Sequence, residues 1–232
     1  SATLAAADTD SPKNVIFMIG DGMGYNSVDL ANIYQKGETY YQLETGNDNK
    51  PVIAGSNAAP PTEGFQSWDL YGMATHWLDG NPYDPNKAWS DFDWVKENYT
   101  DSAAAGTAMA TGHKTYNAGV GVDGDENVVE NVSERAKSLG KAAGVVSNVP
   151  VNHATPAAFS VHNESRNNLH ALLESQIESD MDVIIGAGHP LYDDDGQLAA
   201  TPDTNYVPVE QYERLSGGQT DWTFVEEKAD FE

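Results

Sequence analysis

Cysteine, positive charge and long apolar runs are missing or scarce in this sequence of 232 residues. Because there is no cysteine, a disulfide framework and thiol catalysis are both excluded. Lys and Arg number 12 against 36 Asp and Glu, which gives a formal net charge of -24. Such an acidic surface repels nucleic acid and anionic membranes, so we expect neither as a partner. No apolar run approaches the roughly 18 residues that predict a membrane-spanning helix.

The excess of acid has two explanations, a disordered chain or a folded protein adapted to high salt. A disordered acidic chain is poor in aromatic residues, whereas this one contains 5 Trp and 11 Tyr. We therefore expect a folded, halophilic protein in which salt screens the self-repulsion. Its first residues, SATLAAADTDSPKN, are typical of a mature end left after signal removal, or of a flexible tail. We expect a periplasmic or secreted location.

Strand and helix patterns alternate along much of the chain. Val15–Ile19 is an apolar run that predicts a strand, followed by a glycine-rich turn and a helix within 25–37. Residues 37–97 are rich in Asn, Asp, Pro, Gly and Trp, and they predict a long insertion with short elements, including strands near 69–77. The predicted elements beyond residue 100 are a helix over 101–111, a hairpin turning at 123–124, a helix over 129–141, a strand over 142–149, a loop over 150–159, a helix over 167–179 and a strand over 180–188. Beyond Pro190 the pattern indicates no further element.

This alternation predicts an α/β fold, a three-layer α/β/α sandwich with a mostly parallel central sheet. In open α/β sheets, ligands bind beyond the carboxyl ends of the strands. The turn that contains Asp21 and the loop that contains His153 both follow predicted strands. Both segments are therefore candidates for a functional site.

Two acidic or hydroxyl side chains stand at special positions. Asp21 lies between two glycines after a predicted strand, where a carboxylate either binds a metal cation or caps the next helix. Ser102 follows Asp101 at the start of a helix of small residues, where unpaired N–H groups favour an alkoxide or a phosphate. Spacing alone favours the simpler alternative, in which Thr100, Asp101 or Ser102 is only an N-cap. If Ser102 is a nucleophile, a metal is the better activator, because no Ser-His-Asp order can be assembled locally.

The stretch after the predicted strand at 142–149 offers three more candidates. His153 and Thr155 are plausible metal-site groups, although a lone loop histidine is more often polar surface. Arg166 is one of only three arginines, and it suits either bidentate phosphate recognition or a surface salt bridge. Other histidines are predicted to be structural: His162, His170 and His189.

Three stretches together resemble the alkaline phosphatase family. VIFMIGDGMG is similar to its first metal-binding segment, and TDSAAAGTAMATGHKTYN is similar to its nucleophile segment. NVPVNHATPAAFSVHNESR is similar to the segment with the magnesium-side residues and the phosphate-binding arginine. The matches occur in order over about residues 13–190. The resemblance implies hydrolysis of phosphate monoesters at alkaline pH with two Zn²⁺ and one Mg²⁺.

The resemblance also implies a role for each candidate residue. Ser102, ionised by zinc, would attack phosphorus and form a phosphoserine, which a zinc-bound hydroxide would hydrolyse to inorganic phosphate. Arg166 would hold two phosphate oxygens, and Asp101 would help to orient it. The metal-side residues would be Asp21, bridging zinc and magnesium, Thr155, binding magnesium, and His153, holding a magnesium water where some members have Asp.

Members of this family continue with a second half that supplies most zinc ligands, and no Asp-His cluster follows residue 190 here. We therefore expect residues 1–232 to be the N-terminal portion of a single domain in a longer enzyme, and the family favours a homodimer. A related phosphodiesterase would more often use Thr as nucleophile and dispense with Arg166, and a sulfatase would need Cys/Ser-x-Pro-x-Arg, which DSAAAG does not match. The alternative from another class is a non-catalytic acidic binding module.

Overall fold

The computed structural model describes residues 12–37, 43–45, 51–53, 68–69, 71, 73–82, 84–97 and 99–232. The chain divides into two compact units, Ser1–Tyr71 and Gly72–Glu232, each with its own internal contacts. Within the described ranges, no helix combines the length and the apolar character that crossing a membrane requires.

The described part of the first unit contains a helix and a small sheet. α1 (Tyr25–Lys36) is the predicted helix, and it ends at Gly37, whose φ of 76° is the left-handed conformation that glycine adopts readily. β1 (Leu43–Thr45) pairs antiparallel with β2 (Pro51–Ile53). These two short strands fall within the predicted insertion.

The strand predicted over Val15–Ile19 is wrong. Residues 14–20 belong to no strand and no helix among the described residues. Apart from the half-buried Ile19, these residues are exposed, with Val15 at 85% and Met18 at 88%. A continuous apolar run becomes a strand when neighbouring strands and helices bury both of its faces. The described part of the first unit provides no such burial for this run.

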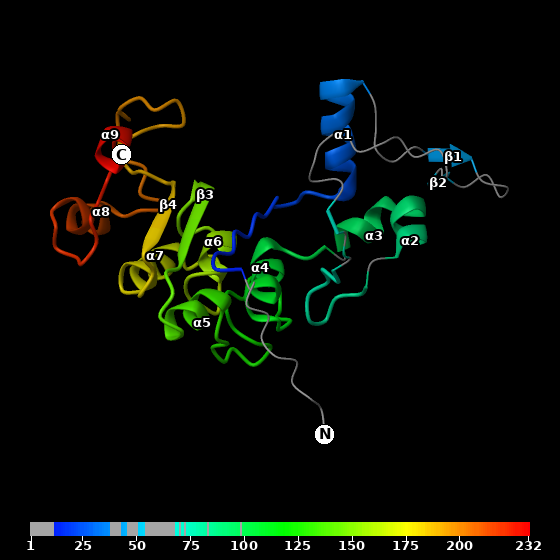
Figure 1. Cartoon of the computed structure of the whole chain (residues 1–232), viewed down its shortest axis with the longest axis horizontal. Helices are drawn as coiled ribbons and strands as arrows, with labels where there is room; N and C mark the ends of the chain where they lie inside the picture. The colour runs from blue at the N-terminus through cyan, green and yellow to red at the C-terminus, as the bar shows by residue number, and fades with distance from the viewer. Residues whose placement is uncertain are drawn as a thin grey trace. The chain divides into compact units, whose positions relative to one another are not determined.

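The second unit contains the parallel sheet (Figure 1). β3 (Gly144–Pro150) pairs in parallel with β4 (Val183–Ala187), and Val145 lies opposite Ile184. α7 (Leu169–Ile177) lies between the two strands in the sequence. A strand, a helix and a parallel strand in this order form a βαβ unit. The predicted α/β fold with a parallel sheet is confirmed.

The core of this unit depends on very small residues where two helices meet. α4 (Ser102–Thr111) packs against α6 (Ala154–Ala158). A Cβ atom added to Gly106 would lie 3.1 Å from Cβ of Ala158, which leaves no room for a larger side chain without a shift. The buried alanines of the two helices are Ala103, Ala104, Ala110, Ala154, Ala157 and Ala158. The alanine-rich sequence therefore permits a close approach of the two helices.

Two ion pairs connect separate segments of the second unit. Glu174 on α7 accepts hydrogen bonds of 2.7 and 2.8 Å from Arg214 and one of 2.8 Å from Gln211. These bonds, with that from Arg214 first, lower the pKa of Glu174 below its ordinary value. Asp182 accepts from Lys137 at 2.8 Å, and this bond lowers the pKa of Asp182. Charge pairs thus tie helices to each other and to the sheet.

Most of the other predicted elements are confirmed, with small changes in their bounds. The hairpin turns as expected, because the N–H of Asp123 donates to Asn127 O and Val122 bridges Val128. The loop predicted over 150–159 is wrong, because it contains α6. Pro156 signals a break, yet it lies in the first turn of the helix, where its missing N–H is not needed. The remaining helices of the unit are α2 (Pro85–Ser90), α3 (Phe92–Glu97), α5 (Val132–Ser138), α8 (Val209–Ser216) and α9 (Lys228–Phe231).

Two of these helices were not expected, and the strands predicted near 69–77 are absent from the described residues. α8 and α9 follow Pro190, where the pattern indicated no element. α8 has only two turns and α9 only one, so neither is long enough for a clear periodicity. The strands predicted near 69–77 are wrong, since none of the described residues in that range is in a strand.

Candidate active site

Asp101 and Ser102 occupy different positions at the start of α4. Asp101 is the N-cap, with extended backbone angles, and its Oδ1 accepts the N–H of Ala104 at 2.9 Å. Ser102 is the first residue of the helix proper. Because Asp101 caps the helix, the hydroxyl of Ser102 is not required for capping. Ser102 thus lies at the positive end of the helix dipole, where an alkoxide or phosphate is stabilised.

The second carboxylate oxygen of Asp101 joins two further segments to the helix. Its Oδ2 accepts the N–H of Ala118 at 3.0 Å and Nη1 of Arg166 at 3.2 Å. The ion pair is well shielded, since the Arg166 side chain is 22% exposed and that of Asp101 is 15% exposed. A shielded pair is less screened by salt than a surface pair. Asp101 therefore fixes Arg166 close to the helix start that carries Ser102.

Arg166 makes a second contact, with His153. Its Nη2 lies 3.4 Å from Nε2 of His153. Since a guanidinium can only donate, Nε2 of His153 is the acceptor in this contact. The backbone N–H of Arg166 also donates to Ala118 O at 2.8 Å. Asp101 and His153 thus meet at one guanidinium, and a third segment, at Ala118, bonds the backbone of the same arginine.

His153 and Thr155 are positioned by the connection from β3 to α6. The N–H of His153 donates to Pro150 O at 2.9 Å, and His153 then serves as the N-cap residue of α6. Thr155 lies against α4, because its Cα is 3.8 Å from the Cβ position at Gly106. Gly106 is one helical turn after Ser102, on the same face of α4. The close packing of the small helices therefore brings Thr155 to the face that carries Ser102.

The predicted metal ligands do not all lie in the same unit. Asp21 lies in the first unit, in the turn after residues 14–20, with an exposed carboxylate. Ser102, Thr155 and His153 belong to the second unit, and their oxygen and imidazole groups suit magnesium and zinc. In the part of the chain that the structure describes, no three His, Cys, Asp or Glu side chains gather into a metal-binding group. These residues therefore suit one part of a metal site, and a complete site requires further ligands.

Sequence reasoning missed two residues of this site, Asn117 and Ala118. Oδ1 of Asn117 accepts the N–H of Asp101 at 3.0 Å, and its amide donates to Tyr99 O at 3.3 Å. Ala118 bonds Asp101 and Arg166, as described above. The only available signal was the turn chemistry of Asn-Ala-Gly after Tyr116, which indicates a loop but not its contacts. Neither residue carries a side chain that suggests catalysis.

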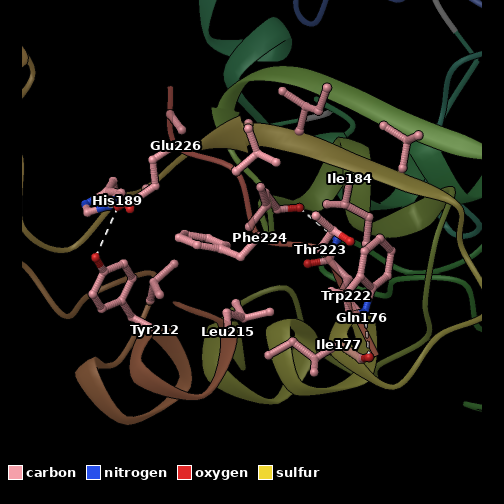
Figure 2. A pocket seen from close by; sticks show the side chains of 18 of the residues that line it. Gln176, Ile177, Ile184, His189, Tyr212, Leu215, Trp222, Thr223, Phe224 and Glu226 are labelled. Carbon is pink, nitrogen blue, oxygen red and sulfur yellow. Dashed lines mark hydrogen bonds and ion pairs between the residues drawn. The ribbon is translucent and has the colours of Figure 1, made fainter. Parts of the chain in front are cut away.

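A cavity of about 650 Å³ lies elsewhere in the same unit (Figure 2). It lies between β4, α7, α8 and the segment 222–231. Figure 2 shows His189, Tyr212 and Glu226 near one another at one end of it. Oε1 of Glu226 accepts from Nε2 of His189 at 2.5 Å and from the hydroxyl of Tyr212 at 3.1 Å. These polar groups thus bond one another at this end of the cavity.

The fold and the site together define an α/β protein with a hydroxyl at a helix start and a clamped arginine beside it. The family model described as alkaline phosphatase matches residues 85–212, which is more than half of the chain and includes Asp101, Ser102, His153, Thr155 and Arg166. This chain belongs to the alkaline phosphatase family.

Individual relatives agree with this family. Alkaline phosphatase 4 of Bacillus subtilis is 36% identical over 196 residues, which cover 81% of this chain and 35% of that protein. Alkaline phosphatase of Escherichia coli K12 is 36% identical over 72% of this chain and 29% of that protein. The crystal structure of a cold-active alkaline phosphatase from a psychrophilic Shewanella has a TM-score of 0.59 and 26% identity, covering 91% of this chain and 41% of that one. The chain spans about a third of the length of these curated relatives, and its fold is alkaline-phosphatase-like.

Proposed function

We propose that this chain carries the nucleophile and the phosphate-binding arginine of a metal-dependent alkaline phosphatase. The observation that carries the proposal is the start of α4, where Ser102 opens the helix and Asp101 holds Arg166 at 3.2 Å. The relatives from Bacillus subtilis and Escherichia coli, which are named for this activity, support it. Since the match covers about a third of their length, we assign the activity to the full-length protein, with residues 1–232 as its N-terminal portion.

Ser102 supplies the nucleophile in this proposal. Its Oγ attacks the phosphorus of a phosphate monoester, the bond from phosphorus to the alcohol oxygen breaks, and the alcohol leaves with a proton. Water then attacks the phosphoserine, the serine oxygen leaves and regains a proton, and inorganic phosphate is released. The positive end of α4 stabilises negative charge on the serine oxygen in both steps.

Arg166 binds and orients the phosphoryl group. A guanidinium held by Asp101 presents its planar fork in a fixed direction, which suits two phosphate oxygens at once. A monoester has three non-bridging oxygens to offer, and a diester has two. Pre-set orientation also lowers the entropy lost in reaching the transition state. Because a related phosphodiesterase would dispense with this arginine, its presence in the site favours a monoesterase.

We propose two Zn²⁺ and one Mg²⁺ as cofactors, with Asp21, Ser102, Thr155 and His153 as the residues of this chain that would hold them. When bound, such ions lower the pKa of a hydroxyl and of water, and they neutralise phosphate charge. That neutralisation matters here because a phosphate dianion approaches a chain of net charge -24. Arg166 contributes to the same local positive potential.

We also propose a homodimer and a periplasmic or secreted location, both of which the resemblance to the alkaline phosphatase family favours. Light scattering of the full-length protein tests the dimer, since a monomer mass at micromolar concentration would contradict it. Cell fractionation tests the location, and a purely cytoplasmic protein would contradict that part.

The central test is hydrolysis of 4-nitrophenyl phosphate at alkaline pH by the full-length protein. We expect Ser102→Ala to lower kcat by about 10³-fold or more, because the nucleophile is lost. A zinc chelator should abolish the activity of the wild type. Ser138→Ala is the matched control, because Ser138 is an exposed helical serine whose hydroxyl bonds only Arg135 O among its described contacts.

Two further readouts separate the alternatives. Radioactive phosphate should label the wild type and the Ser138→Ala variant but not Ser102→Ala. Faster turnover of bis(4-nitrophenyl) phosphate than of the monoester would favour the phosphodiesterase. A folded, metal-loaded protein with neither activity nor label would leave the non-catalytic binding module.

A further inference from the structure

We propose that Asn117 and Ala118 form a positioning element for the phosphate-binding arginine. We call these two residues the 117–118 bracket. The bracket bonds both Asp101 and Arg166. It acts on the phosphoryl group only through Arg166. This inference rests on the proposed function, since it concerns the same site.

The first observation is that hydrogen bonds close a ring through Ala118. Its N–H donates to Oδ2 of Asp101 at 3.0 Å, and its carbonyl accepts the N–H of Arg166 at 2.8 Å. The Arg166 side chain returns to the same Oδ2 at 3.2 Å. The backbone of Arg166 is thus linked to this carboxylate oxygen through Ala118, and its side chain bonds the same oxygen directly. A shift of Ala118 would move both ends of the arginine.

The second observation is the backbone of Ala118. Its φ of 81° is in the left-handed region, which is sterically disfavoured for a residue with a Cβ. Such strain persists only where the surrounding structure imposes it, and it is concentrated at functional sites. Ala118 makes two backbone bonds in this conformation, both to the arginine site. Strain and site geometry therefore point to the same residue.

The third observation concerns Asn117, which fixes Asp101 from its backbone. Its Oδ1 accepts the N–H of Asp101 at 3.0 Å, while its amide group donates to Tyr99 O at 3.3 Å. The side chain thus bridges Tyr99 and Asp101, the N-cap residue of α4. Asp101 is held at its own N–H by Asn117 and at its carboxylate by Ala118. Four bonds from two adjacent residues restrain the ion pair and the segment that leads into α4.

The consequence is a guanidinium whose direction is set before phosphate arrives. A displacement of about 1 Å at a catalytic group can cost 10²-fold in rate. Removing the bracket should therefore weaken phosphate binding while the protein stays folded. The effect should appear in KM for the monoester and in the inhibition constant of inorganic phosphate, because Arg166 contacts the phosphoryl group in both.

The test uses Ala118→Val in the full-length metal-loaded enzyme. A β-branched residue is disfavoured in the left-handed region, so the backbone should leave it and the ring should open. We expect KM for 4-nitrophenyl phosphate and the inhibition constant of phosphate to rise about tenfold, which corresponds to about 1.4 kcal/mol. Ala118→Gly keeps the N–H, the carbonyl and the positive φ, and it should return both constants to near the wild-type values.

The matched control is Glu126→Val. Glu126 is the other described non-glycine residue with a positive φ, at 65°, and it lies in the hairpin turn. Its substitution imposes the same kind of strain without touching the ring at Ala118. Equal changes in KM for Ala118→Val and Glu126→Val would overturn the proposal, because they would show a general effect of strain. Asn117→Ala provides a second variant without backbone strain, and an unchanged KM there would also overturn it.

A ligand-free measurement separates this inference from the proposed function. Urea unfolding of Asn117→Ala, Arg166→Ala and the double variant gives the coupling between the bracket and the arginine. Coupling in a protein without phosphatase activity would support the bracket and overturn the function. Activity that depends on Ser102, without coupling and without a KM change, would do the reverse.

Discussion

At the residue scale, Asp101 performs two tasks with its two carboxylate oxygens. Oδ1 caps α4 through Ala104, and Oδ2 holds Arg166 and the N–H of Ala118. Two substitutions separate these tasks, because asparagine keeps an oxygen for the cap but loses the charge.

We expect Asp101→Ala to lower the free energy of unfolding by about 2 kcal/mol, since the cap and the acceptor for Ala118 are both lost. Asp101→Asn should cost about half as much, because its side-chain oxygen still caps α4. Both variants should raise KM for the monoester about tenfold, since neither holds Arg166 by charge. Urea unfolding and steady-state kinetics check this, and an unchanged KM in Asp101→Asn would show that the charge is unnecessary.

The same scale shows how far the sequence could predict the site. Asp101, Ser102, His153 and Arg166 were predicted from residue type, position and resemblance, and the structure brings them together. Whether Asp101 or Ser102 caps α4 could not be decided from spacing, since both are good caps. Ala118 could not be predicted at all, because its contribution comes from backbone groups and a positive φ. Asp21 lies in the first unit, so its metal role stays a prediction.

At the element scale, the packing of α4 on α6 sets the place of two candidate metal-side residues. α6 carries Thr155 and follows His153, and its distance from α4 depends on Gly106. The sequence predicted the helix over 101–111 well, because the capping residues and Gly112 mark its ends. It failed for α6, since a helix of five residues with an internal proline has no periodicity to detect.

Gly106→Val should therefore affect stability and activity together. Its side chain would meet Cβ of Ala158, and overpacking of this kind costs about 1–3 kcal/mol, slightly offset by a better helix propensity than glycine. Displacement of α6 should also lower kcat/KM about tenfold. Ala108→Val is the control, because this half-buried position on the same helix should lose only about 0.5 kcal/mol through propensity. Melting temperatures and kcat/KM of both variants check this, and equal losses would contradict a specific helix contact.

At the scale of the whole molecule, charge rather than packing separates this chain from an ordinary domain. With 36 acidic and 12 basic residues, most carboxylates have no cation to pair with. Two of its few cations form partly shielded ion pairs. Arg166 pairs with Asp101 at the site, and Arg214 of α8 pairs with Glu174 of α7. The composition predicted this self-repulsion, but it could not predict which few pairs are shielded, because that depends on the fold.

Salt should stabilise the protein strongly. Raising NaCl from about 0.1 to 1 M shortens the Debye length from roughly 10 to 3 Å, which screens the repulsion among surface carboxylates. Screening also weakens exposed ion pairs such as Lys96 with Asp93, but these contribute little and are limited by the number of cations. We expect the melting temperature to rise by about 5 °C or more, equivalent to roughly 1–2 kcal/mol for a protein of this size. Sucrose is the control, because it stabilises by exclusion without screening charge, so a melting temperature that rises with sucrose but stays flat or falls with NaCl would contradict salt adaptation.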